Sequence, residues 1–242
     1  MQQYFCNTPL TIGEDYVMTK DQAHHAVNVL HLDHETVRLV YEGTGYFGTL
    51  VPDGKKAVVH IDAQDERINE PEGEIILAIA LIRREKFEWI LQKATELGVT
   101  RIIPFESSRC VVHARKEKAD RQKDRWNAIV QSAAEQCKRN RIPTVEDVMS
   151  FSDLMKQNAQ LKICAYEKAQ QHSHWLTDLY SDQKEVLVLI GPEGGFSESE
   201  IEQVVHNNYT PCTLGSRILR AETAALYCLS VLSEINEKRR TK

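Results

Sequence analysis

A short apolar run that stops at a glycine-rich turn constrains the fold of this chain more than any other stretch. Residues Val186–Ile190 read Val-Leu-Val-Leu-Ile, and Gly191–Gly195 read Gly-Pro-Glu-Gly-Gly. A run of aliphatic residues without polar alternation is typical of a parallel strand that is buried on both faces. Ser197 and Glu200 then have the spacing of a capping box, which predicts the start of a helix. The stretch therefore predicts a strand, a tight loop and a helix, the unit from which α/β sheets are built.

A second glycine-bearing loop follows closer to the C-terminus. Residues Leu214–Ala224 read Leu-Gly-Ser-Arg-Ile-Leu-Arg-Ala-Glu-Thr-Ala and run into the last predicted helix. Loops at the carboxyl ends of strands present backbone N–H and C=O groups to ligands, and glycine allows a ligand to approach the backbone closely. Arg217, Arg220 and Glu222 are concentrated in this loop. The two glycine-bearing loops together predict a ligand site. The alternative is that both are ordinary strand-to-helix turns.

The composition describes an ordinary folded protein. Hydrophobic residues make up 42% and charged residues 27% of the 242 residues, as in typical globular domains. No apolar run has the length of a membrane span, and the N-terminus lacks the apolar region of a signal peptide. The 6 cysteines include no Cys-x-x-Cys pair, which indicates reduced thiols. We therefore expect a cytoplasmic protein without a membrane partner.

Charge is unevenly distributed along the chain. The net charge of −5 argues against a uniformly basic nucleic-acid binder. Between Arg101 and Arg141, however, there are 11 Lys and Arg against 5 Asp and Glu. A local basic surface on an acidic protein can bind a phosphate backbone. A solvated helical face with mixed charges is the alternative interpretation.

Residues 1–70 are predicted to form a small, barrel-like β domain. Asp21–Leu30 has apolar residues at helical spacing. Three strand-like runs follow at Thr36–Tyr41, Tyr46–Val51 and Ala57–Ala63, separated by glycine-containing turns. The acidic segment Asp65–Gly73 contains a proline and is the predicted linker.

Four histidines in this region raise the question of a metal site: His24, His25, His31 and His34. The first two are adjacent and point to different faces of the predicted helix, and no carboxylate or cysteine completes a ligand set. We therefore predict no metal, and a surface or RNA-facing role for these side chains.

Residues 73–242 are predicted to form an α/β domain, because strand-like and helix-like segments alternate. The predicted strands are Glu74–Ile82, Val99–Phe105, Leu161–Tyr166, Val186–Ile190 and Pro211–Leu214. The predicted helices are Glu85–Leu97, Glu117–Lys138, Phe151–Met155, Glu198–Asn207 and Ala221–Glu237, and Gln171–Tyr180 is a loop or helix. This alternation predicts a parallel sheet with helices on both faces and a ligand site at the carboxyl ends of its strands.

The two glycine loops together carry a resemblance to a known family. Ile190–Ser197 and Leu214–Ala224 resemble the RsmE family, the small-subunit ribosomal RNA uridine-N3 methyltransferases of the SPOUT class. Gln92–Val99, Arg109–Cys110 and Ala134–Pro143 extend the resemblance over most of the chain. It implies a PUA-like N-terminal domain, a SPOUT domain with a trefoil knot, and a homodimer. The implied cofactor is S-adenosyl-L-methionine (SAM), and the implied substrate is small-subunit ribosomal RNA, free or in the assembled small ribosomal subunit.

The resemblance also implies roles for individual residues. The expected SAM-binding residues are Tyr166, Glu167, Gly191, Gly195, Leu214, Gly215, Ile218 and Leu219. Ile218 and Leu219 would line the adenine pocket, with a place in the hydrophobic core as the alternative. Arg220 and Arg109 would stabilise charge on the uridine ring, and Glu222 or Glu193 would accept the proton or anchor a loop. Glu222 could equally cap the last helix.

Contacts to ribosomal RNA are expected from Arg139, Arg141 and His31. His31 stands where relatives usually carry an arginine, which lowers the expected positive charge of the N-terminal domain.

Two other functions are compatible with the same residues. The chain could be a non-enzymatic RNA-binding module in which the glycine loops are structural. It could also be another SPOUT RNA methyltransferase that acts on a different base or on a ribose hydroxyl. A phosphate-binding NTPase is a poor match, because Gly191–Gly195 lacks the Lys-Ser/Thr of a P-loop.

Overall fold

The computed structural model describes residues 1–54, 56–114, 116–166 and 174–240. The chain forms two compact units, Met1–Glu70 with Ala134–Arg141, and Pro71–Ala133 with Ile142–Lys242. Residues 134–141, which the sequence predicts to belong to the C-terminal domain, pack with the first unit instead. The described residues include no helix that is both long and apolar enough to cross a membrane.

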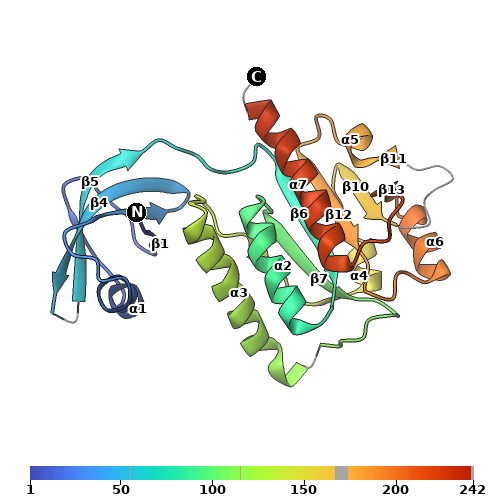
Figure 1. The fold of residues 1–242 in the computed structure, drawn as a ribbon, viewed down its shortest axis with the longest axis horizontal. Coiled ribbons are helices and arrows are strands. Elements are labelled where there is room, and N and C mark those ends of the chain that lie inside the picture. The colour runs from blue at the N-terminus through green and yellow to red at the C-terminus, as the bar shows by residue number, and fades with distance from the viewer. Residues whose placement is uncertain (55, 115, 167–173, 241–242) are drawn as a thin grey trace. The chain divides into compact units, whose positions relative to one another are not determined.

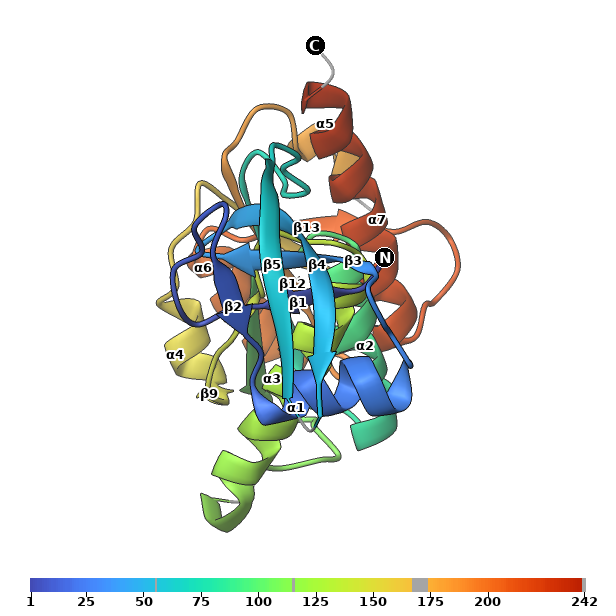
Figure 2. The same cartoon turned by 90° about the vertical axis from the view of Figure 1, so that its left-hand side faces the viewer.

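A five-stranded sheet and a short helical segment make up the first unit (Figure 2). Its elements are β1 (Gln3–Phe5), β2 (Asp15–Val17), α1 (Lys20–Ala23), a π-helical turn (His24–Val29), β3 (Thr36–Tyr41), β4 (Thr44–Asp53) and β5 (Lys56–Asp65). The strand order is β1-β3-β4-β5-β2, with β1 parallel to β3 and the other pairs antiparallel. Alternate side chains of the strands, including Leu39, Leu50 and Val59, form its apolar core.

The expected barrel differs from this sheet in two ways. The ladder over the described residues has two ends, β1 and β2, so hydrogen bonding does not close it into a barrel. The three predicted strands are present as β3, β4 and β5, but β1 and β2 were not predicted as strands. At 3 residues each, these edge strands are too short for a recognisable alternation of apolar and polar residues.

The second unit is an α/β fold. Its strands are β6 (Glu74–Ala80), β7 (Arg101–Glu106), β8 (Thr144–Val145), β9 (Met149–Ser150), β10 (Leu161–Ala165), β11 (His174–Trp175), β12 (Glu185–Ile190) and β13 (Thr210–Thr213). Its helices are α2 (Arg84–Glu96), a 3₁₀ turn (Lys116–Lys118), α3 (Ala119–Gln136, whose last turn belongs to the first unit), α4 (Phe151–Met155), α5 (Leu176–Leu179), α6 (Glu198–His206) and α7 (Ala221–Arg240).

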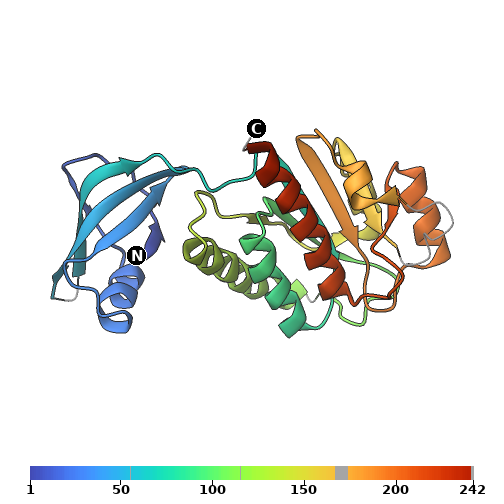
Figure 3. The ribbon, with the colours of Figure 1, turned by 45° about the horizontal axis from the view of Figure 1, so that its top comes forward.

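All strand pairs of the second unit are parallel, in the order β11-β13-β10-β12-β6-β7-β8, with β9 also beside β7. The central strands β6 and β12 are buried from their second residue onward, as their uninterrupted aliphatic sequences predict. Helices α2 and α7 lie side by side against the sheet (Figures 1 and 3). Because the strands run in one direction, their carboxyl ends share one edge of the sheet.

The predicted capping box at the start of α6 is confirmed. The Ser197 hydroxyl accepts a hydrogen bond from the Glu200 N–H at 3.2 Å, and the Glu200 carboxylate accepts one from the Ser197 N–H at 2.8 Å. Two of the otherwise unpaired N–H groups at the helix start are thus satisfied. The box fixes the direction in which the chain leaves the loop after β12.

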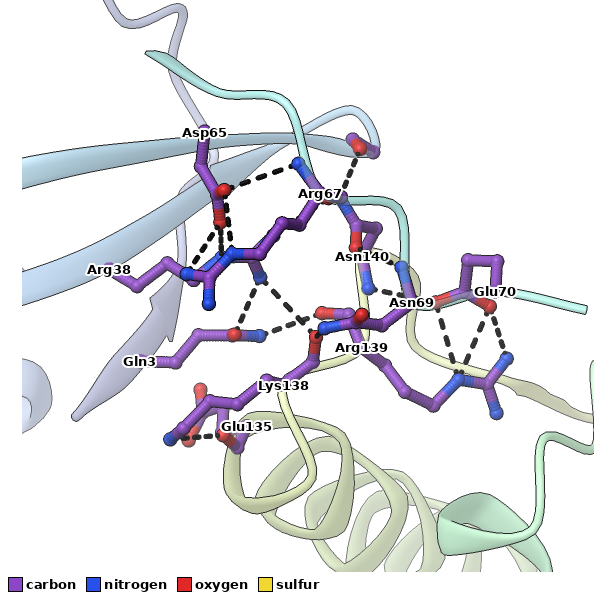
Figure 4. Close-up of polar contacts among 11 residues, drawn as sticks. Gln3, Arg38, Asp65, Arg67, Asn69, Glu70, Glu135, Lys138, Arg139 and Asn140 are labelled. Carbon is purple, nitrogen blue, oxygen red and sulfur yellow. Dashed lines mark hydrogen bonds and ion pairs between the residues drawn. The ribbon is translucent and has the colours of Figure 1, made fainter. Parts of the chain in front are cut away.

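A buried ion pair holds the first unit together (Figure 4). The Arg38 guanidinium donates to the Asp65 carboxylate at 2.7 Å and to the Gln3 amide oxygen at 2.7 Å, and the Arg38 residue is only 1% exposed. Gln3 in turn donates to the backbone carbonyl of Arg139 at 2.8 Å. Residues 134–141 are therefore tied to the sheet by a chain of hydrogen bonds that starts at Asp65.

The folded protein strongly favours the ionised form of the Asp65 carboxyl over the protonated form. Burial raises the pKa of its carboxyl, but hydrogen bonds from Arg67 and Arg38 outweigh burial and lower that pKa to about 2. A carboxyl whose pKa falls on folding stabilises the folded state above its unfolded pKa, which is about 3.9. This stabilisation is lost as the pH falls from that value toward the folded pKa.

We expect Asp65→Asn to destabilise the first unit by about 3–5 kcal/mol, because it leaves the buried Arg38 charge without a counterion. The variant should also lose less stability than the wild type when the pH falls from about 5 to about 2, because it lacks this titrating group. Denaturant unfolding of the full-length protein at several pH values measures both effects. Asp62→Asn is the matched control, because Asp62 is exposed on the same strand; equal losses in the two variants would contradict the expectation.

Candidate functional site

Tyr166 and the loops after β12 and β13 follow neighbouring strand ends in the second unit. In the sheet register, Ala165 of β10 pairs with Ile190 of β12 on one side and with Cys212 of β13 on the other. The next N–H along β10, that of Tyr166, donates to the Cys212 carbonyl at 3.1 Å. Tyr166, the loop after β12 and the loop after β13 are therefore brought together at one edge, as the sequence analysis predicted for parallel strands. Glu167, the next residue in the proposed cofactor set, lies outside the described residues.

The loop after β12 is closed over an aromatic side chain. A Cβ atom at Gly191 would lie 2.8 Å from the ring of Phe196, so only glycine fits this position without a shift of the ring. Phe196 is buried, and its ring centroid lies 6.2 Å from that of Phe151. The Gly195 N–H donates to the Pro192 carbonyl at 2.9 Å. These contacts give the loop a defined shape before any ligand arrives.

The loop after β13 depends on a different property of glycine. Gly215 has a φ of 107°, which side-chain-bearing residues rarely adopt, and no heavy atom lies within 4 Å of where its Cβ would be. Its N–H donates to the Thr213 hydroxyl at 3.2 Å. Ile218 is 85% exposed, which excludes the core position considered for it, whereas Leu214 and Leu219 are half-buried against the core.

Lys86 links the loop after β12 to the first turn of α7, and it was not identified from the sequence. Its ammonium group lies 2.6 Å from the Glu193 carboxylate and 3.1 Å from that of Glu222. Hydrogen bonds to Glu193 and then Glu222 raise the pKa of Lys86, and the hydrogen bond from Lys86 lowers the pKa of Glu193. The helix containing Lys86 follows the carboxyl end of β6, so charged residues directly after this strand were the signal available in the sequence.

The two carboxylate oxygens of Glu222 differ in their contacts. Its Oε1 atom contacts Lys86, while Oε2 is buried and has no hydrogen-bond partner among the described residues. An unsatisfied buried carboxylate oxygen is costly unless a ligand or water supplies a donor. Glu222 lies in the first turn of α7, and the exposed Arg220 is the last residue of the loop before this helix. The Arg220 charge lies near enough to contribute to the lowered pKa of Glu193.

Arg109 reaches the loop after β12 from the segment that follows β7. Its guanidinium donates to the carbonyl oxygens of Gly194 at 3.3 Å and Phe196 at 3.2 Å. The neighbouring Ser108 N–H donates to the buried Glu200 carboxylate at 2.8 Å. Arg109 thus contacts the loop that contains Glu193. Its Nη1 group already donates hydrogen bonds to two backbone carbonyls of this loop.

The three residues expected to contact RNA all belong to the first unit. Arg141 and His31 are exposed. Arg139 is buried, and its guanidinium lies 2.6 Å from the Glu70 carboxylate (Figure 4). The expectation of a phosphate contact from Arg139 is therefore corrected, because its charge is paired inside the unit.

Comparisons with known proteins agree with this arrangement. The profile of the RNA methyltransferase domain family matches residues 69–233. The chain is 34% identical over 247 aligned positions to ribosomal RNA small subunit methyltransferase E of Bacillus subtilis, covering 96% of each chain. It is 32% identical to the protein of the same name from Mesomycoplasma hyopneumoniae, covering 89% of this chain and 92% of that one.

A solved structure is also similar over nearly the whole chain. The crystal structure of ribosomal RNA small subunit methyltransferase E from Neisseria gonorrhoeae bound to S-adenosyl methionine has a TM-score of 0.89 and 28% identity, covering 97% of this chain and 98% of that one. With the loops, the sheet and the sequence relatives in agreement, this chain belongs to the RNA methyltransferase family of ribosomal RNA small subunit methyltransferase E.

Proposed function

We propose that this protein transfers a methyl group from SAM to the N3 atom of a uridine in small-subunit ribosomal RNA. The observation that carries the proposal is the meeting of Tyr166, at the end of β10, with the loops after β12 and β13 at one edge of the sheet. The relatives that share this chain's length and sequence are methyltransferases of the small-subunit ribosomal RNA by name. The choice of N3 follows from the loop sequences that resemble the uridine-N3 enzymes.

SAM is assigned to the space bounded by these loops. The backbone groups of Tyr166, Glu167, Gly191, Gly195, Leu214 and Gly215 would hold it, and the side chains of Ile218 and Leu219 would line its adenine. The fit rests on two observations. Gly215 leaves open space where a side chain would stand, and the exposed apolar side chain of Ile218 gives an adenine ring a surface to cover. When bound, SAM supplies an electrophilic methyl group on a sulfonium sulfur.

The protein must remove the imide proton of the uridine, because the protonated nitrogen has no free electron pair for in-line attack. We assign proton acceptance to Glu222, whose Oε2 atom is buried without a partner. Lys86 lowers the pKa of Glu193, and we assign Glu193 to anchoring the loop. Arg109 and Arg220 would stabilise the negative charge that spreads onto the ring oxygens.

The finer features of the fold and assembly belong to the same proposal. The second unit would be a SPOUT domain with a trefoil knot, and the first unit a PUA-like RNA-binding domain with Arg141 and His31 on its surface. A homodimer is supported by Trp89 on α2 and Tyr227 on α7, which are 44% and 42% exposed on helices that pack together. Large exposed aromatic side chains are typical of interfaces. We place the protein in the cytoplasm, with free rRNA or the assembled small subunit as substrate.

Methyl transfer from labelled SAM to small ribosomal subunits, taken from cells that lack the protein, tests the proposal. Nucleoside analysis of the product RNA should find the label in N3-methyluridine. Label in another base or in a ribose would point to a different RNA methyltransferase activity. Absence of both methyl transfer and calorimetric SAM binding would indicate an RNA-binding module instead.

Gly215→Ala should weaken SAM binding by at least tenfold. A side chain at φ 107° costs about 1–3 kcal/mol of backbone strain, which the loop can relieve only by leaving the conformation that we assign to cofactor binding. Calorimetric titration with SAM gives the affinity. Gly13→Ala is the matched control, because Gly13 also has a positive φ and open space around it but lies in the first unit. Similar SAM affinities in the two variants would refute the assignment.

Arg220→Ala should reduce kcat by roughly 10²–10³-fold, the usual effect of losing one donor to a developing negative charge. SAM affinity should change little, because the backbone of the loop is retained. Single-turnover methyl transfer under saturating SAM measures the loss. Arg217→Ala serves as the control, since Arg217 is another exposed arginine of the same loop. The proposed role is wrong if both variants transfer methyl groups at the same rate.

A further inference from the structure

A cavity of about 640 Å³ in the second unit is not used by the proposed cofactor site. It lies between α2 and α3, beside the segment that follows β6. Its walls come from Leu81, Ile82, Arg84, Phe87, Glu88, Val112, His113, Lys118, Arg121, Gln122, Arg125 and Trp126. The sequence predicted no binding or catalytic role for any of these residues, and none belongs to the residues assigned to SAM or to the methylated uridine.

The rim of this cavity is positively charged. Arg84 and Arg125 both bind the Glu88 carboxylate, with contacts of 2.8 Å from Arg84 and 2.7 Å from the Arg125 Nη2 atom. These hydrogen bonds, that of Arg125 first, lower the pKa of Glu88 to about 2. One ionised carboxylate therefore holds two guanidinium groups in place, which leaves an excess positive charge at this part of the rim.

Two further cations at the rim are exposed and form no contact of this kind with the described residues. Lys118 and Arg121 are exposed, and within the described parts of the chain neither makes an ion pair or a side-chain hydrogen bond. The ring of His113 lies 3.6 Å from the Glu106 carboxylate. The rim thus combines two fixed guanidinium groups with two unpaired cations, a set that suits phosphate.

The floor of the cavity is apolar and partly aromatic. Phe87 and Trp126 pack with ring centroids 4.7 Å apart, and Leu81 and Ile82 lie beside them. An apolar floor beneath a cationic rim matches a nucleotide, which has a flat base and a charged phosphate.

The cavity lies close to the proposed reaction site, on the opposite face of the start of α2. Lys86 reaches Glu193 and Glu222, whereas Arg84 and Glu88 line the cavity. At about 100° per residue, positions 84 and 88 point away from position 86 across the helix. The two sites are therefore separated by about one helix diameter, on the order of 10 Å. Neighbouring nucleotides of one RNA strand can span such a distance.

We propose that this cavity binds a nucleotide that flanks the methylated uridine in the substrate RNA. Its base would rest on the floor formed by Phe87, Ile82 and Trp126, and its phosphate would contact Lys118, Arg121 and Arg84. The inference deepens the proposed function and rests on it. The cavity would hold the RNA strand in register while the uridine occupies the edge formed by the glycine loops, so it would contribute to substrate affinity more than to the chemical step.

The test is the steady-state kinetics of methyl transfer to small ribosomal subunits by the full-length double variant Lys118→Glu/Arg121→Glu. We expect the KM for the subunits to rise at least tenfold while kcat stays within about twofold and calorimetric SAM affinity is unchanged. The control is Lys123→Glu/Lys156→Glu, which makes the same change in charge at lysines that pair with Asp147 and Asp153 and do not line the cavity. An equal rise in KM for both double variants would mean that only net charge matters, and would overturn the proposal.

A second measurement examines the cavity directly. Titration with uridine 5′-monophosphate and the other nucleoside monophosphates should quench tryptophan fluorescence in the wild type. Trp126→Phe should remove that quenching, and Lys118→Glu/Arg121→Glu should weaken the binding at least tenfold. Nucleosides without phosphate should bind more weakly. Quenching that is unchanged in both variants would also overturn the proposal.

The remaining outcomes separate this inference from the proposed function. If the wild type binds SAM but methylates no small-subunit RNA, the proposed function is wrong. The assignment of the cavity to a nucleotide beside the methylated uridine is then wrong as well. If the double variant methylates protein-free rRNA with normal KM but loses affinity for assembled subunits, the cavity binds a ribosomal protein and the nucleotide assignment is wrong. If the double variant matches the wild type on both substrates, the cavity has no part in binding, although the proposed function stands.

Discussion

The parallel register of β13, β10, β12 and β6 is the constraint on which the candidate site depends. Ala165 pairs with both Ile190 and Cys212, and Ile190 also pairs with Ile79. Four strands therefore end at the same level, and the segments that follow them must share one edge. The aliphatic side chains of β6 and β12 hold this register, because a shift by one residue would exchange the buried faces of the strands. The site is thus a consequence of core packing.

Helix α2 contributes residues both to the candidate site at the strand ends and to the basic cavity beside it. Its first turn presents Lys86 to the carboxylate of Glu193, in the loop after β12, and to that of Glu222, in the first turn of α7. The opposite side of the same turn presents Arg84 and Glu88 to the basic cavity. A short helical segment thereby positions the proposed reaction site and the proposed binding site for a flanking nucleotide, and α2 itself packs on α7.

Much of this arrangement could be predicted from the sequence, and the exceptions have physical reasons. The strand at Val186–Ile190 and the capping box at Ser197 are local features, so their sequences were sufficient. The role of Lys86 was missed because its partners lie 107 and 136 positions away in the chain, and no local pattern reports such contacts. Arg139 was assigned to RNA because it lies in a basic segment; its burial against Glu70 depends on tertiary packing. The edge strands β1 and β2 were too short to show a period.

A crystal structure of the full-length protein with S-adenosylhomocysteine, the product of methyl transfer from SAM, tests the central claim most directly. We predict that this ligand lies at the carboxyl ends of β10, β12 and β13, with backbone contacts from Gly191 and Gly215 and its adenine against Ile218. Electron density for the ligand elsewhere on the protein, with these loops making no contact to it, would contradict the account.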